Sequence, residues 1–395
     1  MSPASPALAP IKWPWLPRAI RRPLRFIKGR IKRRNSLALR RARDAIVGNF
    51  VVPVIYRRRL NRYRAGAPYI PAGHLPRFLY LRPKYVPRII GEKELCPVFE
   101  DQGPLRSSKV AEVAEYFYDL NYSGGILGDK QLIDQVIEYR PDLIILSGYN
   151  HKDLKMPSSR VLRAIRHRCG IQIMREWGDS MGPISVEDCY HLMDTVDLNV
   201  VRDSENLMQH FAGNPKFLRM WPPYDFSLFR PGNGQRDINV SFIGFREGYR
   251  SVRNEYLSYL QERQTGVFVG GGRGEDRLKE GELADITRRS KIGLNFSFSI
   301  PGTHQFKGRV FQVMFSVALL MENENSETPR YFTPMVDYVV FDSKEDLLDK
   351  CRYYLEHDEE RQEIAYNGYM KATKEYNYQV YWDTIIGRLK ELQLI

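Results

Sequence analysis

The chain has 395 residues, of which 43 % are hydrophobic, and this length is enough to bury the cores of two domains. Its four cysteines, Cys96, Cys169, Cys189 and Cys351, have no paired spacing, which argues against a zinc site or a disulfide framework and favours a reducing compartment. The net charge of +13 is uneven, because residues 1–64 hold 18 Lys or Arg and a single acidic residue, which leaves −4 for the rest of the chain.

Residues 1–75 are predicted to form a basic amphipathic arm. Met1–Pro17 lacks the continuous apolar stretch of a secretory signal, and the longest apolar piece, Ala45–Tyr56, is too short to span a bilayer. From Arg18 onwards, basic clusters alternate with apolar and aromatic residues. This mixture suits the headgroup region of an anionic membrane.

Three interpretations of the arm stay open: peripheral membrane attachment through residues 1–64, a disordered basic tail, and an arm for nucleic acid or organelle targeting. We favour attachment to an anionic membrane surface and regard nucleic acid as the less favoured partner. The protein would then lie in the cytoplasm, at the inner face of the cell membrane.

Residues 76–225 are predicted to form an N-terminal Rossmann-like domain, because short apolar runs alternate with helical patterns. The expected strands are Phe78–Arg82, Leu143–Leu146, Gly170–Met174 and Leu198–Arg202. The expected helices are Lys109–Leu120, Leu132–Tyr139, Val161–Arg168, Ser185–Met193 and Asp203–Phe211. We expect Asp203 or Ser204 to cap the last of these helices. The alternation predicts a parallel sheet with functional groups in the loops that follow the strands.

Three polar residues in these loops are candidate catalytic residues. His151 follows the strand Leu143–Leu146, and we expect Glu176 and Asp179 in the loop after Gly170–Met174. A histidine or a carboxylate at such a place would orient or deprotonate an acceptor hydroxyl group. The alternative for each of them is an ordinary polar loop residue.

Residues 220–237, rich in Pro and Gly, mark the boundary to a second domain predicted at 237–375. Its expected strands are Ile238–Ile243, Gly266–Gly272, Ile292–Phe298 and Val317–Met321. Its expected helices are Arg253–Gln261, Leu283–Ser290, Val310–Phe315, Glu345–His357 and Glu359–Tyr376. Residues 376–395 are predicted to return as a helix towards the N-terminal domain.

The stretch Ser290–Glu327 holds the clearest candidate site. A buried strand leads through a loop to Lys307 and Arg309, which open an apolar helix. Ligands bind outside the carboxyl ends of strands in open α/β sheets, and a helix N-terminus flanked by Lys and Arg suits a phosphate. Glu322 and Glu324, after the next strand, would accept hydrogen bonds from sugar hydroxyls. These features predict a nucleotide-sugar site, against the alternative of a solvated basic pair that opens a core helix.

The segment KGRVFQVMFSVALLMEN, followed by YFTP, resembles the C-terminal domain of GT-B glycosyltransferases, and within them the CgeB-like (spore maturation), glycosyl transferases group 1 family. The resemblance covers about residues 237–385. It implies the GT-B fold, an α/β architecture with two Rossmann-like doubly wound domains that face a cleft. It also implies transfer of a hexosyl group from a nucleotide-diphosphate sugar to an envelope, lipid-linked or other glycan acceptor, with no metal ion and no further cofactor.

The resemblance implies where the donor would bind. Lys307 and Arg309 would stabilise the leaving diphosphate, and Arg246 or Arg250 would touch it from the turn at Gly244. By the same resemblance, an acidic residue after the next strand, Glu322 or Glu324, would hold the donor sugar or ribose.

The chain departs from the related retaining family 4, which has glutamates at the positions of His304 and Gln312. His304 would touch the donor sugar or its phosphate. The departure keeps open a second interpretation, a catalytically inactive GT-B scaffold that binds partners and is held at a membrane by its basic arm.

Overall fold

The structure is a computed structural model. It describes residues 60, 63, 75–87, 95–97, 109–149, 155–178, 180, 183–203, 205–224, 227–246, 251–272, 278–299 and 303–395. The predictions for the basic arm lie outside these ranges, apart from a few residues near its end. The candidates His151, Asp179 and Arg250 also lie outside them.

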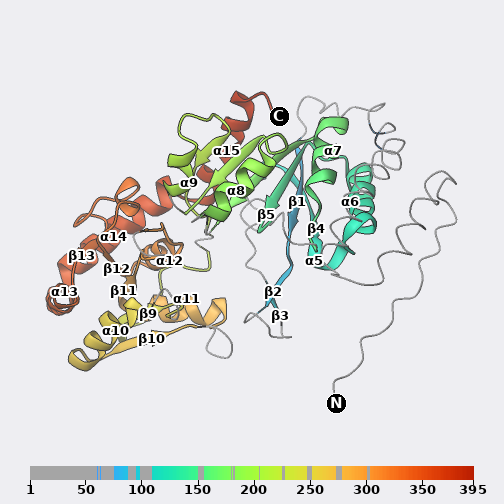
Figure 1. Cartoon of the computed structure of the whole chain (residues 1–395). Coiled ribbons are helices and arrows are strands. Elements are labelled where there is room, and N and C mark those ends of the chain that lie inside the picture. The colour runs from blue at the N-terminus through green and yellow to red at the C-terminus, as the bar shows by residue number, and fades with distance from the viewer. Residues whose placement is uncertain are drawn as a thin grey trace, which may run out of the picture. The chain divides into compact units, whose positions relative to one another are not determined.

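The N-terminal sheet has six strands in the order β4-β1-β5-β6-β7-β8, and every neighbouring pair is parallel (Figure 1). Its strands are β1 (Arg77–Arg82), β4 (Glu112–Phe117), β5 (Leu143–Ser147), β6 (Gln172–Trp177), β7 (Leu198–Val201) and β8 (Phe217–Arg219). The helices between them are α5 (Tyr118–Asn121), α6 (Gly125–Tyr139), α7 (Ser159–Cys169), α8 (Pro183–Leu192) and α9 (Glu205–His210). A separate antiparallel pair is formed by β2 (Tyr85–Pro87) and β3 (Leu95–Pro97).

The helix predicted at Lys109–Leu120 is wrong over its central half, because Glu112–Phe117 forms strand β4, and only the end of the segment is helical, in α5. Its apolar residues fit a helical stripe, but Val113 and Phe117 also favour a strand. Pairing decides between the two, since β4 lies in parallel register along the whole of β1, from Arg77 opposite Glu112 to Arg82 opposite Phe117. Tertiary pairing thus overrides the local periodicity.

The C-terminal sheet has five parallel strands in the order β10-β9-β11-β12-β13 (Figure 1). Its strands are β9 (Ile238–Ile243), β10 (Val267–Gly270), β11 (Ser290–Asn295), β12 (Leu319–Asn323) and β13 (Val339–Phe341). Its helices are α10 (Val252–Arg263), α11 (Glu280–Arg289), α12 (Arg309–Phe315), the 3-10 turn η4 (Thr328–Arg330), α13 (Lys344–Glu356) and α14 (Asp358–Glu375).

Both sheets are doubly wound, because each first strand has its second strand on one side and its third strand on the other. In the C-terminal sheet β9 lies between β10 and β11, so the chain reverses its winding direction between β9 and β11. Ligands of such sheets bind at this switch point, outside the carboxyl ends of the two strands. The topology therefore points to the ends of β9 and β11, at Ile243 and Asn295.

The last helix, α15 (Tyr378–Glu391), buries Tyr381 and Trp382 completely. The hydroxyl of Tyr381 donates to Oε1 of Glu176 in β6 at 3.4 Å. The ring of Tyr381 also lies beside that of Trp221, with centroids 6.0 Å apart. The C-terminal helix is thereby joined to the N-terminal sheet.

In the described part of the chain, no helix is long and apolar enough to cross a membrane.

Candidate active site

Arg309 lies at the switch point of the C-terminal sheet. Its Nε donates to the carbonyl of Ile243, the last residue of β9, at 2.7 Å, and its Nη1 donates to Oδ1 of Asn295, the last residue of β11, at 2.7 Å. The guanidinium carbon lies 4.9 Å from the ring centroid of Phe242. Two strand ends and one aromatic ring therefore fix the guanidinium in place.

Gly244 makes room for this guanidinium. A Cβ atom at Gly244 would lie closer than 3.0 Å to Nη2 of Arg309, nearer than real Cβ atoms approach their neighbours. The backbone here is also held, because the N–H of Gly244 donates to the carbonyl of Gly270 at 2.9 Å. The close approach of Arg309 thus explains why the turn after β9 needs a glycine, which has no Cβ atom.

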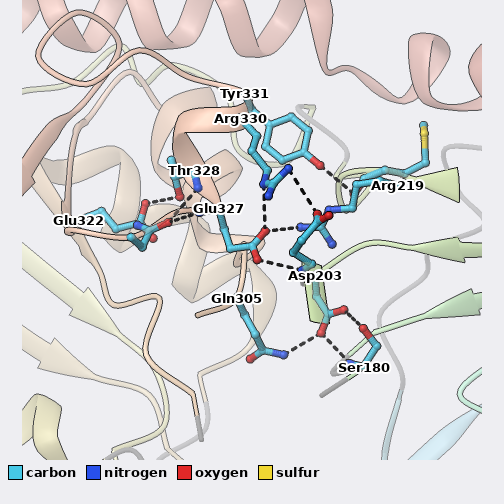
Figure 2. A network of polar contacts seen from close by, with 12 residues as sticks. Ser180, Asp203, Arg219, Gln305, Glu322, Glu327, Thr328, Arg330 and Tyr331 are labelled. Carbon is cyan, nitrogen blue, oxygen red and sulfur yellow. Dashed lines mark hydrogen bonds and ion pairs between the residues drawn. The ribbon is translucent and has the colours of Figure 1, made fainter. Parts of the chain in front are cut away.

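Glu322, one of the two acidic residues expected to hold the donor sugar or ribose, is fully buried at the end of β12. Its Oε1 accepts from Nδ2 of Asn295 at 2.6 Å. Its Oε2 accepts from Oγ1 of Thr328 at 2.7 Å (Figure 2). Burial raises the pKa of Glu322 to about 7, while its hydrogen bonds and the charge of Arg309 oppose that shift. Glu322 therefore supports Asn295 behind Arg309 and presents no exposed oxygen to a ligand. Glu324 is exposed.

Lys307 reaches back along the loop, and its Nζ donates to Oε1 of Gln305. In the following helix, the first backbone donors are already used, because Val310 N bonds to the Lys307 carbonyl at 3.1 Å and Phe311 N bonds to the Gly308 carbonyl at 3.1 Å. The positive charge at this point of the sheet therefore comes from the side chains of Lys307 and Arg309 more than from helix donors.

His304 and Gln312 lie on different elements. His304 is half-buried in the loop before α12, where its Nδ1 lies 2.8 Å from Oγ of Ser297, and burial lowers its pKa. Gln312 is partly buried within α12. Neither side chain is a carboxylate, so neither can accept hydrogen bonds as a glutamate would.

Arg253, in α10, is a buried residue whose role the sequence pattern did not indicate. Its Nη1 donates to the carbonyl of Phe245 at 3.0 Å, and its Nη2 donates to the carbonyls of Phe296 at 3.1 Å and Phe298 at 2.8 Å. Arg253 thus ties together the segments that follow β9 and β11, on either side of Arg309. The neighbouring candidate Arg246 is partly exposed.

Glu176 was expected in a loop, and this prediction is wrong. Strand β6 runs through Trp177, and Glu176 is buried inside the N-terminal domain. Its carboxylate accepts from the hydroxyls of Tyr80 and Tyr381, and Arg202 lies 4.0 Å away. Pairing with β5 and β7 continues the strand past Met174, with Glu176 opposite Ser147 and Val200, and the Glu176 side chain packs against Tyr80 of β1 and Tyr381 of α15. Both oxygens of Glu176 are used in that packing, so it is not placed as an open catalytic base.

A polar network joins segments of the two domains (Figure 2). Oδ2 of Asp203, after β7, accepts from Nε2 of Gln305 at 2.7 Å and from the N–H of Ser180 at 2.8 Å. Glu327 accepts from Nη2 of Arg219 at 2.8 Å and from the N–H of Glu205 at 2.9 Å. The N–H of Glu205, the first residue of α9, is therefore satisfied by Glu327 of the C-terminal domain. Of the two caps expected from the sequence, Asp203 accepts from Ser180 and Gln305 instead, and Ser204 lies outside the described residues.

Comparisons with known proteins agree with this architecture. Residues 252–387 match the family model described as "Glycosyl transferase-like". Anabaena HepE in complex with UDP-glucose superposes with a TM-score of 0.56 at 11 % identity, over 80 % of this chain and 100 % of that one. The fold is GT-B. A glycosyltransferase from Rickettsia africae shares this GT-B fold with a TM-score of 0.54 at 11 % identity, over 81 % and 99 % of the two chains.

The GT-B architecture recurs in an alpha-glucosyltransferase in complex with UDP-glucose and DNA, with a TM-score of 0.54 at 10 % identity over 79 % of this chain and 99 % of that one. No curated protein sequence matches the chain. Among the residues that the structure describes, no group of three or more His, Cys, Asp or Glu could hold a metal ion.

Proposed function

We propose that the protein is a glycosyltransferase that moves a hexosyl group from a nucleotide-diphosphate sugar to a glycan or lipid-linked acceptor. The observation that carries the proposal is the position of Arg309, held between the ends of β9 and β11 at the switch point of the C-terminal sheet. The family-model match over residues 252–387 and the GT-B structures solved with UDP-glucose support it.

In this proposal Arg309 and Lys307 stabilise the diphosphate as it leaves the sugar. The negative charge on the leaving group grows in the transition state, so positive groups already fixed in position lower the barrier. Arg309 meets this requirement, because Ile243 and Asn295 hold its guanidinium before any ligand arrives. These side chains would provide the charge stabilisation without a metal ion.

The proposal for the acceptor is based on the sequence alone. We propose that the basic arm, residues 1–64, brings the enzyme to an anionic membrane on the cytoplasmic side, where a lipid-linked or envelope acceptor would be reached. Co-sedimentation of the full chain with anionic liposomes at low and high salt tests this, since attachment by charge weakens as salt rises.

Calorimetric titration with UDP, GDP, ADP, CMP and UDP-glucose tests the donor site. We expect one nucleotide to bind the full chain, and the double change Lys307→Ala with Arg309→Ala to weaken it at least tenfold, because charged hydrogen bonds to the diphosphate are lost. The control removes the same charges from exposed helix positions, by Arg352→Ala with Lys374→Ala. Binding of none of these ligands would count against an active transferase and favour the inactive scaffold.

Gly244→Ala gives a second test that removes no charge. The new methyl group would push Nη2 of Arg309 out of position, and because that atom ends a flexible side chain we expect the fold to persist. Nucleotide affinity should fall about tenfold, the value of one charged hydrogen bond. Gly281→Ala in α11 is the matched control, since a Cβ atom at Gly281 would meet nothing within 4 Å. Equal affinity of the two variants would contradict the role given to Arg309.

A further inference from the structure

A second hydrogen-bonded pair lies next to the one that supports Arg309. Asn295 and Glu322 are neighbours at the ends of β11 and β12, and Ser297 and Asn323 follow them on the same two segments. Ser297 comes two residues after Asn295, a distance of about 7 Å along an extended chain. The loop then folds back, with Gln305 N bonded to the Ser297 carbonyl at 2.9 Å. Because the loop returns, the imidazole of His304 lies within hydrogen-bond distance of the Ser297 hydroxyl.

The hydrogen bonds fix the orientation of the Asn323 amide. Its Oδ1 accepts from the backbone N–H of Ser297 at 2.7 Å, and its Nδ2 donates to the backbone carbonyl of Glu324 at 2.8 Å. A backbone N–H can only donate and a carbonyl can only accept, so the amide has one possible orientation. Nδ2 then also donates to Oγ of Ser297 at 3.0 Å.

The Ser297 hydroxyl hydrogen has two possible acceptors. Nδ1 of His304 lies at 2.8 Å, whereas Oδ1 of Asn323 lies at 3.2 Å and already accepts a shorter bond from Ser297 N. The hydroxyl therefore donates to Nδ1 of His304. An imidazole whose Nδ1 accepts must carry its proton on Nε2 in the neutral form.

We propose that Ser297 and Asn323 hold His304 in the tautomer protonated at Nε2, and that this N–H donates a hydrogen bond to an oxygen of the bound nucleotide sugar. The inference rests on the proposed function for its ligand, while the tautomer rests on the geometry alone. His304 contacts the ligand, and Ser297 and Asn323 are positioning residues.

Two further observations agree with this assignment. Nε2 of His304 forms no hydrogen bond or ion pair with the described residues, and burial lowers the pKa of the ring, which favours the neutral form. A neutral donor differs in kind from a carboxylate, which can only accept. The site would therefore select an acceptor oxygen at this point, either of a phosphate or of a sugar hydroxyl.

The tautomer is measured by long-range ¹H–¹⁵N correlation spectra of the full chain labelled with ¹⁵N-histidine. The sequence has seven histidines, and His304→Gln assigns the signal of interest. We expect the pattern of protonated Nε2 and unprotonated Nδ1, which Ser297→Ala should convert to a mixture. Ser299→Ala is the control, because its hydroxyl bonds to Gln305 instead. A protonated Nδ1 in the unaltered chain, or no change in Ser297→Ala, would overturn the proposal.

The ligand contact is measured with UDP-glucose and UDP as probes. His304→Gln keeps a neutral N–H donor and should bind UDP-glucose within about threefold of the unaltered chain, whereas His304→Met has no donor and should bind about tenfold more weakly. A loss seen with UDP-glucose alone assigns the contact to the sugar, and a loss with both probes assigns it to the diphosphate. Equal binding by the Met variant would overturn the contact.

Failure of the proposed function has a different signature. If the unaltered chain binds neither probe, or if removing Lys307 and Arg309 leaves binding unchanged, the donor site itself is wrong. The histidine spectrum would still report the hydrogen bond from Ser297, because it needs no ligand.

Discussion

Arg253→Met is expected to lower the free energy of unfolding by about 3 kcal/mol, because it leaves three backbone carbonyls without their donor. Arg253 is 1 % exposed and donates to the carbonyls of Phe245, Phe296 and Phe298. Methionine keeps the apolar stem of the side chain, so the loss reports mainly on the guanidinium. These carbonyls follow β9 and β11, so nucleotide affinity should fall as well.

Urea denaturation followed by circular dichroism measures the change in unfolding free energy. Arg263→Met is the matched control, since it makes the same replacement near the end of the same helix, α10, at an exposed side chain. We expect the control to change stability by less than about 1 kcal/mol. A loss of similar size in both variants would show that the buried guanidinium of Arg253 contributes no more to the free energy of unfolding than the exposed one of Arg263.

Glu322→Gln is expected to make the protein more stable than the unaltered chain at pH 8 but not at pH 5. Burial raises the folded-state pKa of Glu322 from 4.5 to about 7. A group whose pKa is raised on folding favours the folded state at low pH, and this contribution is lost as pH rises through the folded-state value. Between pH 5 and pH 8 the unaltered chain should therefore lose about 2 kcal/mol relative to the variant.

The glutamine amide can keep both partners, with its oxygen accepting from Asn295 and its nitrogen donating to Thr328. Urea denaturation at the two pH values measures the effect. Glu324→Gln is the control, because it removes a carboxylate from the same segment at an exposed position. A difference between Glu322→Gln and the unaltered chain that does not change with pH would refute the raised pKa of this carboxyl group.

Much of the fold was predictable because buried parallel strands need apolar residues on both faces. The strand at Ile238–Ile243 is confirmed at its full length, and Leu143–Leu146 is confirmed to within one residue. Strand β4, within the segment Lys109–Leu120, was not predictable in this way, because its apolar spacing suits either element and only pairing with β1 makes Glu112–Phe117 a strand.

The candidate site was predictable in its position along the chain but not in its contacts. The sequence places Lys307 and Arg309 after a strand and at the start of a helix, and the structure has that order. The roles of Glu322 and Glu176 depended on burial. Neither carboxylate faces an open loop, because packing from other elements covers Glu322 completely and Glu176 almost completely.

The sequence by itself determined three features: two α/β domains, an arm that is strongly basic where the rest of the chain is mildly acidic, and a cationic turn after a central strand. It could do so because periodicity and local charge are properties of neighbouring residues. The tertiary structure alone decided which atoms hold Arg309, which carboxylates are buried and which residue accepts from the first N–H of helix α9. These depend on pairs far apart in the chain, such as Ile243 and Arg309, separated by 66 positions, and Glu205 and Glu327, separated by 122. Hydrogen bonds at such separations leave no local pattern, because each partner is an ordinary polar group until the fold brings them together.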